Sequence, residues 1–282
     1  MSIRLLLCTD LDRTLLPNGP QPESEGARDK FNQLIAYPDI TLVYVTGRDR
    51  RLVEAAVSEY QLPQPSYVIA DVGSTIYQIE QGTWHQLDEW EQIISRDWNG
   101  KSHDDLHALF SHLSHLNLQE ASKQNTFKLS YYLSFDADHE ALMSQMHAIL
   151  VNQYIKASLI WSIDEQAGTG LLDVLPASAS KRHAIEFLME RLGFDLTNTI
   201  FAGDSGNDLA VLTSHIQSVL VGNACSRVRE DALQQALNMG EVDALYFAKG
   251  GFLGMNGNYS AGILEGVAHY IPEIEALLDD AT

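Results

Sequence analysis

The sequence predicts an α/β protein built on a doubly wound parallel sheet, with a second, smaller α+β unit inserted into it. Short apolar runs that end in polar or glycine residues recur toward both ends of the chain, and helical spacing separates them. Strands that alternate with helices favour a parallel sheet covered on both faces. The middle of the chain changes to an alternation of apolar and polar residues, which favours a sheet covered on one face only.

The first strand is predicted in LLLCTDLDRTLLPNG, residues 5–19. The apolar run and the turn formers after it fit a strand buried in a parallel sheet, although a buried helix segment reads similarly. The carboxyl ends of such strands line the ligand crevice, so Asp10 and Asp12 are expected at a site of chemistry. Side chains two residues apart in an extended segment point the same way. Two carboxylates there repel each other unless a cation or a shared proton offsets their charge.

Further strands are predicted from four apolar runs with the same polar or glycine ending. They are ITLVYVTGR at 40–48, SYVIADVGS at 66–74, NTIFAGDSGND at 198–208 and SVLVGNAC at 218–225. Before the last two runs, one helix face is formed by Ala184, Ile185, Leu188 and Leu192. This order of strands and helices predicts a Rossmann-like core.

Residues 81–172 are predicted to form the inserted α+β domain, and residues 1–80 and 173–282 the core. Apolar and polar side chains alternate in NTFKLSYYLSF at 125–135, which indicates a strand with one face toward water. Two helices are expected to cover its other face, in HDDLHALFSHLSHL and HEALMSQMHAILVNQY. Lys128 lies on the polar face with Ser130 and Tyr132, and is the expected ligand contact from the insert, although a solvated sheet face has the same pattern.

A second acidic motif, GDSGND at 203–208, also follows a short apolar strand. Asp204 and Asp208 should therefore reach the same sheet edge as Asp10 and Asp12. Clustered carboxylates without His or Cys partners select a hard cation, and Mg2+ commonly shares its ligands with phosphate oxygens. Either motif alone is often a turn or a cap, but both together after apolar strands predict a magnesium site.

Composition and charge narrow the possible functions. The chain has 282 residues, 45% of them hydrophobic, with 18 basic and 38 acidic side chains and a net charge of −20. This charge opposes binding to nucleic acid and to anionic membranes, and no apolar run approaches the ~18 residues that span a bilayer. An anionic substrate would need a cation and basic groups close by. Two cysteines and no signal-peptide pattern favour a cytoplasmic protein without disulfides.

Four ordered motifs carry a family resemblance. DLDRT at 10–14, TGR at 46–48, Lys181 after DVLPASAS, and GDSGND resemble the motifs of the haloacid dehalogenase (HAD) superfamily and span nearly the whole core. The insert between the second and third motifs resembles the C2B-type cap of the Cof-like, type IIB branch. Within this branch, NTFKLSYYL, DVLPASASK and SAGILEGVAHY are similar to segments of sucrose-phosphate phosphatases, and LPQPSYVIADVGS is also similar to mannosylfructose-phosphate phosphatases.

The resemblance implies roles for individual residues. Asp10 would attack phosphorus and form an aspartyl phosphate. Asp12 would act as acid and then as base, with its main-chain carbonyl helping to hold Mg2+, and Lys181 would offset charge on the transferring phosphoryl group. The implied catalytic residues are Asp10, Asp12, Thr46 and Lys181. The implied metal site consists of Asp10, Asp12, Asp204 and Asp208, the last being either a ligand or a carboxylate that orients water or Lys181. The implied substrate contacts are Gly47, Arg48, Gly73, Ser74, Lys128 and Asn207; Arg48 could instead pair with surface carboxylates.

The predicted function is therefore a Mg2+-dependent phosphatase acting on a disaccharide phosphate. Sucrose 6-phosphate is the first expectation, and mannosylfructose phosphate or another glycosyl phosphate is the alternative. A sugar phosphomutase would have to hold a second phosphate in the insert, where the basic residues are Arg96, Lys101, Lys123, Lys128 and Lys156. A single arginine there disfavours it. A non-catalytic module that binds the glycosyltransferase making the substrate is the remaining hypothesis.

Overall fold

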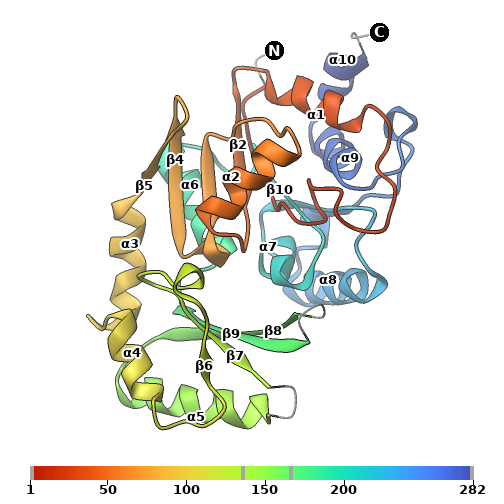
Figure 1. The fold of residues 1–282 in the computed structure, drawn as a ribbon. Coiled ribbons are helices and arrows are strands. Elements are labelled where there is room, and N and C mark those ends of the chain that lie inside the picture. The colour runs from red at the N-terminus through yellow and green to blue at the C-terminus, as the bar shows by residue number, and fades with distance from the viewer. Residues whose placement is uncertain (1–2, 135–136, 165–167, 280–282) are drawn as a thin grey trace.

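The computed structural model describes residues 3–134, 137–164 and 168–279, and these residues form two β-sheets (Figure 1). The larger sheet has eight strands in the order β12-β11-β10-β1-β2-β3-β4-β5. Its parallel strands are β1 (Leu5–Thr9), β2 (Ile40–Val45), β3 (Tyr67–Ala70), β10 (Thr199–Gly203), β11 (Gln217–Leu220) and β12 (Leu245–Phe247). This confirms the predicted doubly wound α/β core.

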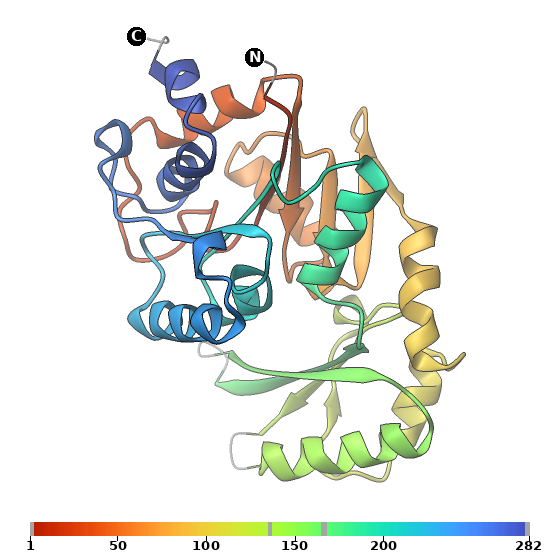
Figure 2. The same ribbon diagram turned by 180° about the vertical axis from the view of Figure 1, so that it is seen from behind.

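Helices cover both faces of the larger sheet. One face packs against α1 (Ala27–Ile35), α2 (Arg50–Glu59), α9 (Ser260–Tyr270) and α10 (Ile274–Asp279). The other face, turned toward the viewer in Figure 2, packs against α3 (Asp88–Ile94), α6 (Lys181–Leu192), α7 (Leu209–Leu212) and α8 (Ser226–Met239). The pleat of β1 divides its side chains between these two cores, with Leu5 and Leu7 in one and Leu6 and Cys8 in the other. Burial on both faces explains why this strand is a continuous apolar run.

An antiparallel hairpin extends the larger sheet beyond the parallel strands. It consists of β4 (Thr75–Glu80) and β5 (Thr83–Gln86), and β4 pairs antiparallel with β3. The predicted insert boundary at residue 81 therefore lies inside this hairpin. At the other end, β9 (Thr169–Pro176) runs past the predicted boundary at 172 as a single strand. We call residues 87–176 the insert. Residues 1, 2 and 280–282 of the predicted core lie outside the described residues.

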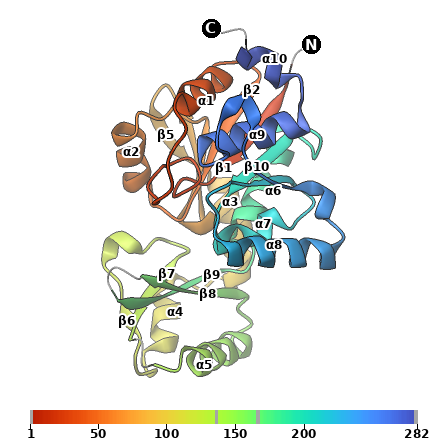
Figure 3. The same cartoon turned by 90° about the vertical axis from the view of Figure 1, so that its right-hand side faces the viewer.

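The smaller sheet lies within the insert and has the order β6-β7-β9-β8, with every neighbouring pair antiparallel. Its remaining strands are β6 (Asn117–Leu118), β7 (Leu129–Leu133) and β8 (Ala157–Asp164). Two helices, α4 (His103–Phe110) and α5 (His139–Asn152), cover the face turned away from the larger sheet (Figures 1 and 3). Leu129, Tyr131 and Leu133 pack with these helices in a separate hydrophobic core, as their alternation predicts.

The opposite face of β7 differs from the prediction of a face open to water. Lys128 is 7% exposed and Ser130 is fully buried. The reason is tertiary: Lys128 pairs with Asp71 of the larger-sheet core at 3.8 Å, and the Ser130 hydroxyl donates to the Lys123 carbonyl at 3.3 Å. The predicted helix at 103–116 is also shorter, since α4 ends at Phe110. Phe135, at the end of the predicted strand, lies outside the described residues.

Within the described residues, none of the helices has the length and apolar character needed to cross a membrane. The edge of the larger sheet where β1, β2, β3 and β10 end faces the insert (Figures 1 and 3). Side chains that come directly after these strands therefore meet in the space between the two sheets.

Candidate active site

The two acidic motifs arrive at one edge because their strands are neighbours. In the parallel register Thr9 is paired with Ala202, and Asp10 continues the ladder by donating its amide to the Ala202 carbonyl at 2.9 Å. Thr46, the residue after β2, is held in the same way by the Ile69 carbonyl at 2.8 Å. These main-chain bonds fix the positions of Asp10 and Thr46 at the ends of their strands.

Three carboxylates meet at this edge and surround one ammonium group. Oxygen atoms of Asp10, Asp204 and Asp208 lie within 4.8 Å of one another, and all three residues are buried. The Nζ atom of Lys181 lies 3.1 Å from Asp10 Oδ1 and 2.6 Å from Asp208 Oδ1. Lys181 is the first residue of α6, which Ser180 caps by accepting a hydrogen bond from the His183 amide. The predicted approach of these distant segments is thus present in the structure.

Burial and crowding perturb the ionisation of this cluster. Burial raises the pKa of Asp10 to about 8, with Asp208 and Asp204 adding to the rise and Lys181 opposing it. Burial and the neighbouring Asp208 raise the pKa of Asp204 to about 7. Burial alone would lower the pKa of Lys181, but the charges of Asp10 and Asp208 outweigh this and raise it. The lysine therefore stays an ammonium, while Asp10 and Asp204 are protonated more readily than ordinary carboxyl groups, and a bound cation would favour their ionised form.

The oxygen atoms of Asp208 are already used by protein donors. One accepts from Lys181, and the other accepts from the main-chain amides of Asp204 and Ser205 at 3.1 and 3.2 Å. The carboxylate lies so close to Gly203 that a Cβ there would be 2.7 Å from the Asp208 Cγ atom, which accounts for the glycine of the GDSGND motif. Asp10 and Asp204 have fewer partners, so they are better placed than Asp208 to bind a metal. An all-oxygen, anionic donor set fits Mg2+.

Asp12 lies beside this cluster and has a different partner. Arg48 binds both of its oxygens, with Nε to Oδ2 at 2.8 Å and Nη2 to Oδ1 at 2.6 Å, and Asn18 donates to Oδ1 at 2.7 Å. Burial would raise the pKa of Asp12, but the hydrogen bonds and charge of Arg48 outweigh it and lower the pKa. The Asp12 carboxylate is therefore neutralised locally and is absent from the triad of Asp10, Asp204 and Asp208. In this respect the expected meeting of four carboxylates at one ion differs from the structure.

The cluster opens into a cavity of about 360 Å³ between the larger sheet and the insert. It is lined by Asp10, Asp12, Arg13, Thr46, Gly47, Arg48, Leu52, Lys123, Asp204, Ser205 and Asn207. Carboxylates with hydroxyl and amide donors line this cavity, and the buried Lys181 contacts one of those carboxylates. These are the groups that phosphoryl transfer requires.

The family model described as sucrose-6F-phosphate phosphohydrolase matches residues 3–271. The chain belongs to this family. It is a phosphoric monoester hydrolase of the HAD superfamily, and the hypothesis of a non-catalytic module is set aside because both the family and the assembled catalytic groups are those of an enzyme.

Three relatives and one solved structure are similar to this chain. A HAD-like hydrolase from Nitrosococcus oceani is 51% identical over 99% of this chain and 75% of its own length. The mannosylfructose-phosphate phosphatase of Agrobacterium fabrum is 28% identical over 94% of this chain and 96% of its own. The glucosylglycerol-phosphate synthase of Pseudomonas anguilliseptica is 25% identical, and the matched region covers 77% of this chain but only 26% of that protein. The structure of the Synechocystis sucrose-phosphatase in complex with sucrose and phosphate superposes with a TM-score of 0.71 at 25% identity, covering 95% of this chain and 98% of that one.

Three predicted substrate contacts of this sucrose-phosphatase family member do not line the cavity. Gly73 has φ 102°, and a Cβ on it would lie 2.3 Å from the main-chain carbon of Ser180, so its role in the structure is to let the start of α6 approach. Ser74 is buried and donates to the Asp71 carbonyl at 3.1 Å. Lys128 lies 3.8 Å from Asp71 Oδ1 in a buried ion pair that joins the insert to the larger sheet. Burial raises the pKa of Asp71, with Lys128 opposing the rise.

Two basic residues at the cavity were not among the predicted site residues. Arg13 lies within DLDRT and has φ 59°, held by a hydrogen bond from its amide to Asn18 and one from Asn223 to its carbonyl. Its Nε atom is 3.5 Å from Asp204 Oδ2. Lys123 reaches the cavity from the insert. The position of Arg13 inside the motif is a signal that sequence reasoning could have used, whereas the position of Lys123 depends on the folding of residues 119–125.

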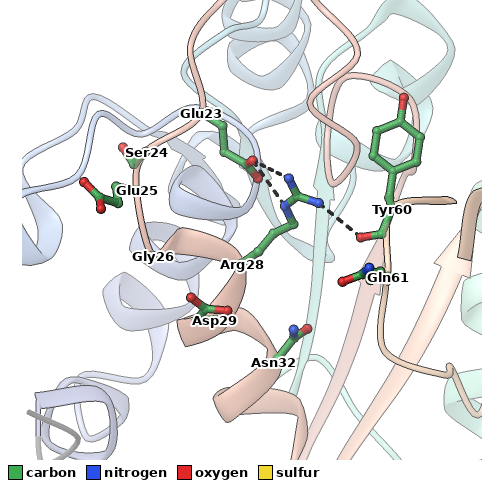
Figure 4. A pocket seen from close by; sticks show the side chains of 9 residues that line it. All are labelled: Glu23, Ser24, Glu25, Gly26, Arg28, Asp29, Asn32, Tyr60 and Gln61. Atoms are coloured by element: carbon green, nitrogen blue, oxygen red, sulfur yellow. Dashed lines mark hydrogen bonds and ion pairs between the residues drawn. The ribbon is translucent and has the colours of Figure 1, made fainter. Parts of the chain in front are cut away.

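A second hollow, of about 470 Å³, lies between the segment before α1 and the residues immediately after α2 (Figure 4). Its basic group is Arg28, which is bound by Glu23 at 2.8 and 3.1 Å and by the Tyr60 carbonyl at 3.1 Å. Its lining holds three acidic side chains, Glu23, Glu25 and Asp29. This surface repels phosphate esters and provides no lysine for phosphoryl transfer, so the chemistry is assigned to the cavity at Asp10.

Proposed function

We propose that this enzyme hydrolyses a disaccharide phosphate, with sucrose 6-phosphate as the substrate, through an aspartyl-phosphate intermediate on Asp10. The observation that carries the proposal is the buried Lys181 ammonium, 3.1 Å from the Asp10 carboxylate at the end of β1, in a chain matched to the sucrose-6F-phosphate phosphohydrolase family. A buried lysine beside a nucleophilic oxygen supplies positive charge where the phosphoryl oxygens gather charge.

Asp10 and Asp204, with the main-chain carbonyl of Asp12, would hold Mg2+. The bound ion supplies positive charge that keeps the nucleophile ionised and offsets the charge of the phosphate. Asp208 acts through its neighbours, since it orients Lys181 and the amides of residues 204 and 205. Thr46, the Gly47 amide and Asn207 bind the remaining phosphate oxygens.

In the first step an oxygen of Asp10 bonds to phosphorus while the bond from phosphorus to the sugar oxygen breaks. The sugar oxygen takes a proton from Asp12, and the sugar leaves as an alcohol. In the second step Asp12 accepts a proton from water, the water oxygen bonds to phosphorus, and the bond to Asp10 breaks. Phosphate leaves and the carboxylate of Asp10 is restored.

Asp12 must gain a proton before the first step, yet Arg48 holds its pKa low in the structure. A substrate phosphate offers Arg48 a second anion within the same cavity, because both residues line it. We infer that Arg48 turns toward the phosphate when substrate binds. The pKa of Asp12 then rises, and the residue becomes an acid in the complex in which an acid is needed.

The positions of the basic residues of the insert distinguish a phosphatase from a phosphomutase. A phosphomutase needs a second phosphate site that faces the cavity. Of the basic insert residues, Lys128 is paired with Asp71, Arg96 and Lys101 line a different hollow, and Lys123 reaches the cavity. A lysine offers a second phosphate no bidentate contact of the kind that an arginine provides. This favours a phosphatase. A mannosylfructose phosphate or another glycosyl phosphate is the second candidate substrate, supported by the relative from Agrobacterium fabrum. The similarity to part of a glucosylglycerol-phosphate synthase supports a glycosyltransferase as the supplier of the substrate and as a partner.

The test is phosphate release from sucrose 6-phosphate, mannosylfructose phosphate and monosaccharide phosphates, with Mg2+ and with EDTA. We expect release from sucrose 6-phosphate at the highest kcat/KM, and only with Mg2+. Asp10→Asn should abolish turnover while circular dichroism and thermal unfolding show an intact fold. Parent-like turnover by this variant would eliminate the nucleophilic role, and a preference for another phosphate ester would replace the substrate.

A further inference from the structure

Residues 119–124 form a rigid platform on the insert sheet. The Gln119 amide donates to the Ser130 carbonyl at 3.0 Å, and its side chain donates to the Tyr131 carbonyl at 3.0 Å. Gln124 donates to the carbonyls of Gln119 and Ser130 at 3.1 and 2.8 Å. The hydroxyl of Ser130 donates to the Lys123 carbonyl at 3.3 Å. The main chain of Lys123 is therefore held at its own carbonyl and by the bonds that Gln119, before it, and Gln124, after it, make to β7.

This platform brings Lys123 to the catalytic cavity, and among the described lining residues it is the one that the insert contributes. Lys123 is exposed, and Arg48 and Leu52 line the same cavity. In the part of the chain that the structure describes, the Lys123 ammonium makes no ion pair or hydrogen bond. The other basic groups of the site are engaged: Arg13 with Asp204, Arg48 with Asp12, and Lys181 with Asp10 and Asp208.

We propose that Lys123 is a specificity-determining residue whose ammonium donates hydrogen bonds to oxygen atoms of the sugar leaving group. The inference rests on the proposed function of the same cavity. Lys123 enters the cavity from the insert, whereas Thr46 and the Lys181 that contacts Asp10, the groups assigned to the phosphate, belong to the larger-sheet core. An ammonium offers three donors and no acceptor, so it binds hydroxyl and ring oxygens without needing a charged partner.

Lys128 lies instead at the junction between the insert and the larger sheet. That lysine is 7% exposed and lies 3.8 Å from Asp71 Oδ1, and its neighbour Asn125 donates to Ser74 Oγ at 3.1 Å. These contacts join the insert to the larger sheet. Substitution of Lys128 should therefore affect all substrates together by loosening this junction, whereas substitution of Lys123 should affect them unequally.

The experiment compares kcat and KM of Lys123→Gln, Lys123→Arg and the parent on sucrose 6-phosphate and on p-nitrophenyl phosphate, which lacks the sugar. A hydrogen bond from a charged donor predicts a loss of roughly 10- to 100-fold in kcat/KM on the sugar phosphate. The loss should appear mainly in KM, as expected for a group that binds substrate and transition state alike. The loss on the aryl phosphate should be much smaller, and Lys123→Arg should recover part of the sugar activity. Lys156→Gln, an exposed lysine of the insert away from the cavity, is the matched control.

Equal losses on both substrates would show that Lys123 binds the phosphate, and parent-like kinetics on both would show that it binds neither group; either result overturns the inference alone. The parent enzyme tests the proposed function separately. If the parent hydrolyses p-nitrophenyl phosphate but no sugar phosphate, the proposed function and the inference fall together.

Discussion

Replacing Lys181 by methionine tests the electrostatic argument for the active site most directly. The substitution keeps an unbranched, similarly long side chain and removes the charge. Lys181 is 3% exposed and contacts Asp10 at 3.1 Å and Asp208 at 2.6 Å. Methionine at this position therefore leaves the carboxylates of Asp10, Asp204 and Asp208 without the ammonium group that they surround. Removing one partner of a buried pair costs about 3–5 kcal/mol. At about 2–4 °C per kcal/mol, the metal-free variant should unfold roughly 6–20 °C below the parent.

The assay is thermal unfolding of parent and variant, once in EDTA and once with Mg2+. A divalent cation bound to the carboxylates replaces part of the missing charge, so the deficit of Lys181→Met should shrink with Mg2+, while turnover stays abolished. Lys156→Met, at an exposed position, is the control and should unfold with the parent. Equal unfolding temperatures of Lys181→Met and parent in EDTA would refute the claim that the lysine balances this cluster. A deficit that Mg2+ does not reduce would refute the assignment of the carboxylates as a metal site.

Further predictions concern backbone fit, pH and the Arg48 pair. Gly73→Ala should lower the free energy of unfolding in a denaturant titration by at least about 1–3 kcal/mol, because φ is 102° and the new Cβ would lie 2.3 Å from a main-chain carbon. Gly206→Ala, where a Cβ meets nothing within 4 Å, is the control and should be nearly neutral. In EDTA the unfolding temperature should fall as pH rises from 5 to about 8. The folded-state pKa of Asp10, about 8, lies above its unfolded value, so its contribution is fully present at low pH and is lost as pH rises through 8; Asp10→Asn should flatten this slope. Arg48→Gln should move the alkaline limb of the pH profile of kcat/KM on sucrose 6-phosphate to higher pH, since Asp12 acts in the first step as an acid and Arg48 holds its pKa down; an unmoved limb would contradict the pairing.

The sequence was sufficient to predict the core and the carboxylates, because both are determined by local pattern. The apolar runs at β1 and β10 predicted two strands of one parallel sheet, whose carboxyl ends share an edge. The structure makes these two strands neighbours. Lys181 could be placed because it opens a helix whose apolar face is visible in the spacing of Ala184, Ile185 and Leu188. In each case a short segment determines the direction of the side chain.

The insert was harder because its contacts depend on segments without periodicity. Lys128 alternates with apolar residues as a solvent-facing side chain would, yet it is 7% exposed and pairs with a carboxylate of the larger-sheet core. Its partner, Asp71, lies 57 residues earlier in the chain, in a turn with φ 51° that no apolar pattern indicates. Lys123 reaches the cavity from a segment without periodicity, which is held by side-chain bonds from Gln119 and Gln124 to main-chain carbonyls of β7.

The charge of the whole chain and the charge of the site are different quantities, and the difference explains how a protein of net charge −20 can accept a dianionic ester. Four basic side chains and four carboxylates gather at the cavity: Arg13, Arg48, Lys123 and Lys181 with Asp10, Asp12, Asp204 and Asp208. Their formal charges sum to 4 − 4 = 0, so a bound divalent cation makes the site +2, the opposite of a phosphate monoester dianion. Salt screens exposed charges beyond about 10 Å at 0.1 M ionic strength. The acidic surface therefore acts on the approach of substrate, whereas the affinity of the site is determined by these eight side chains and the ion among them.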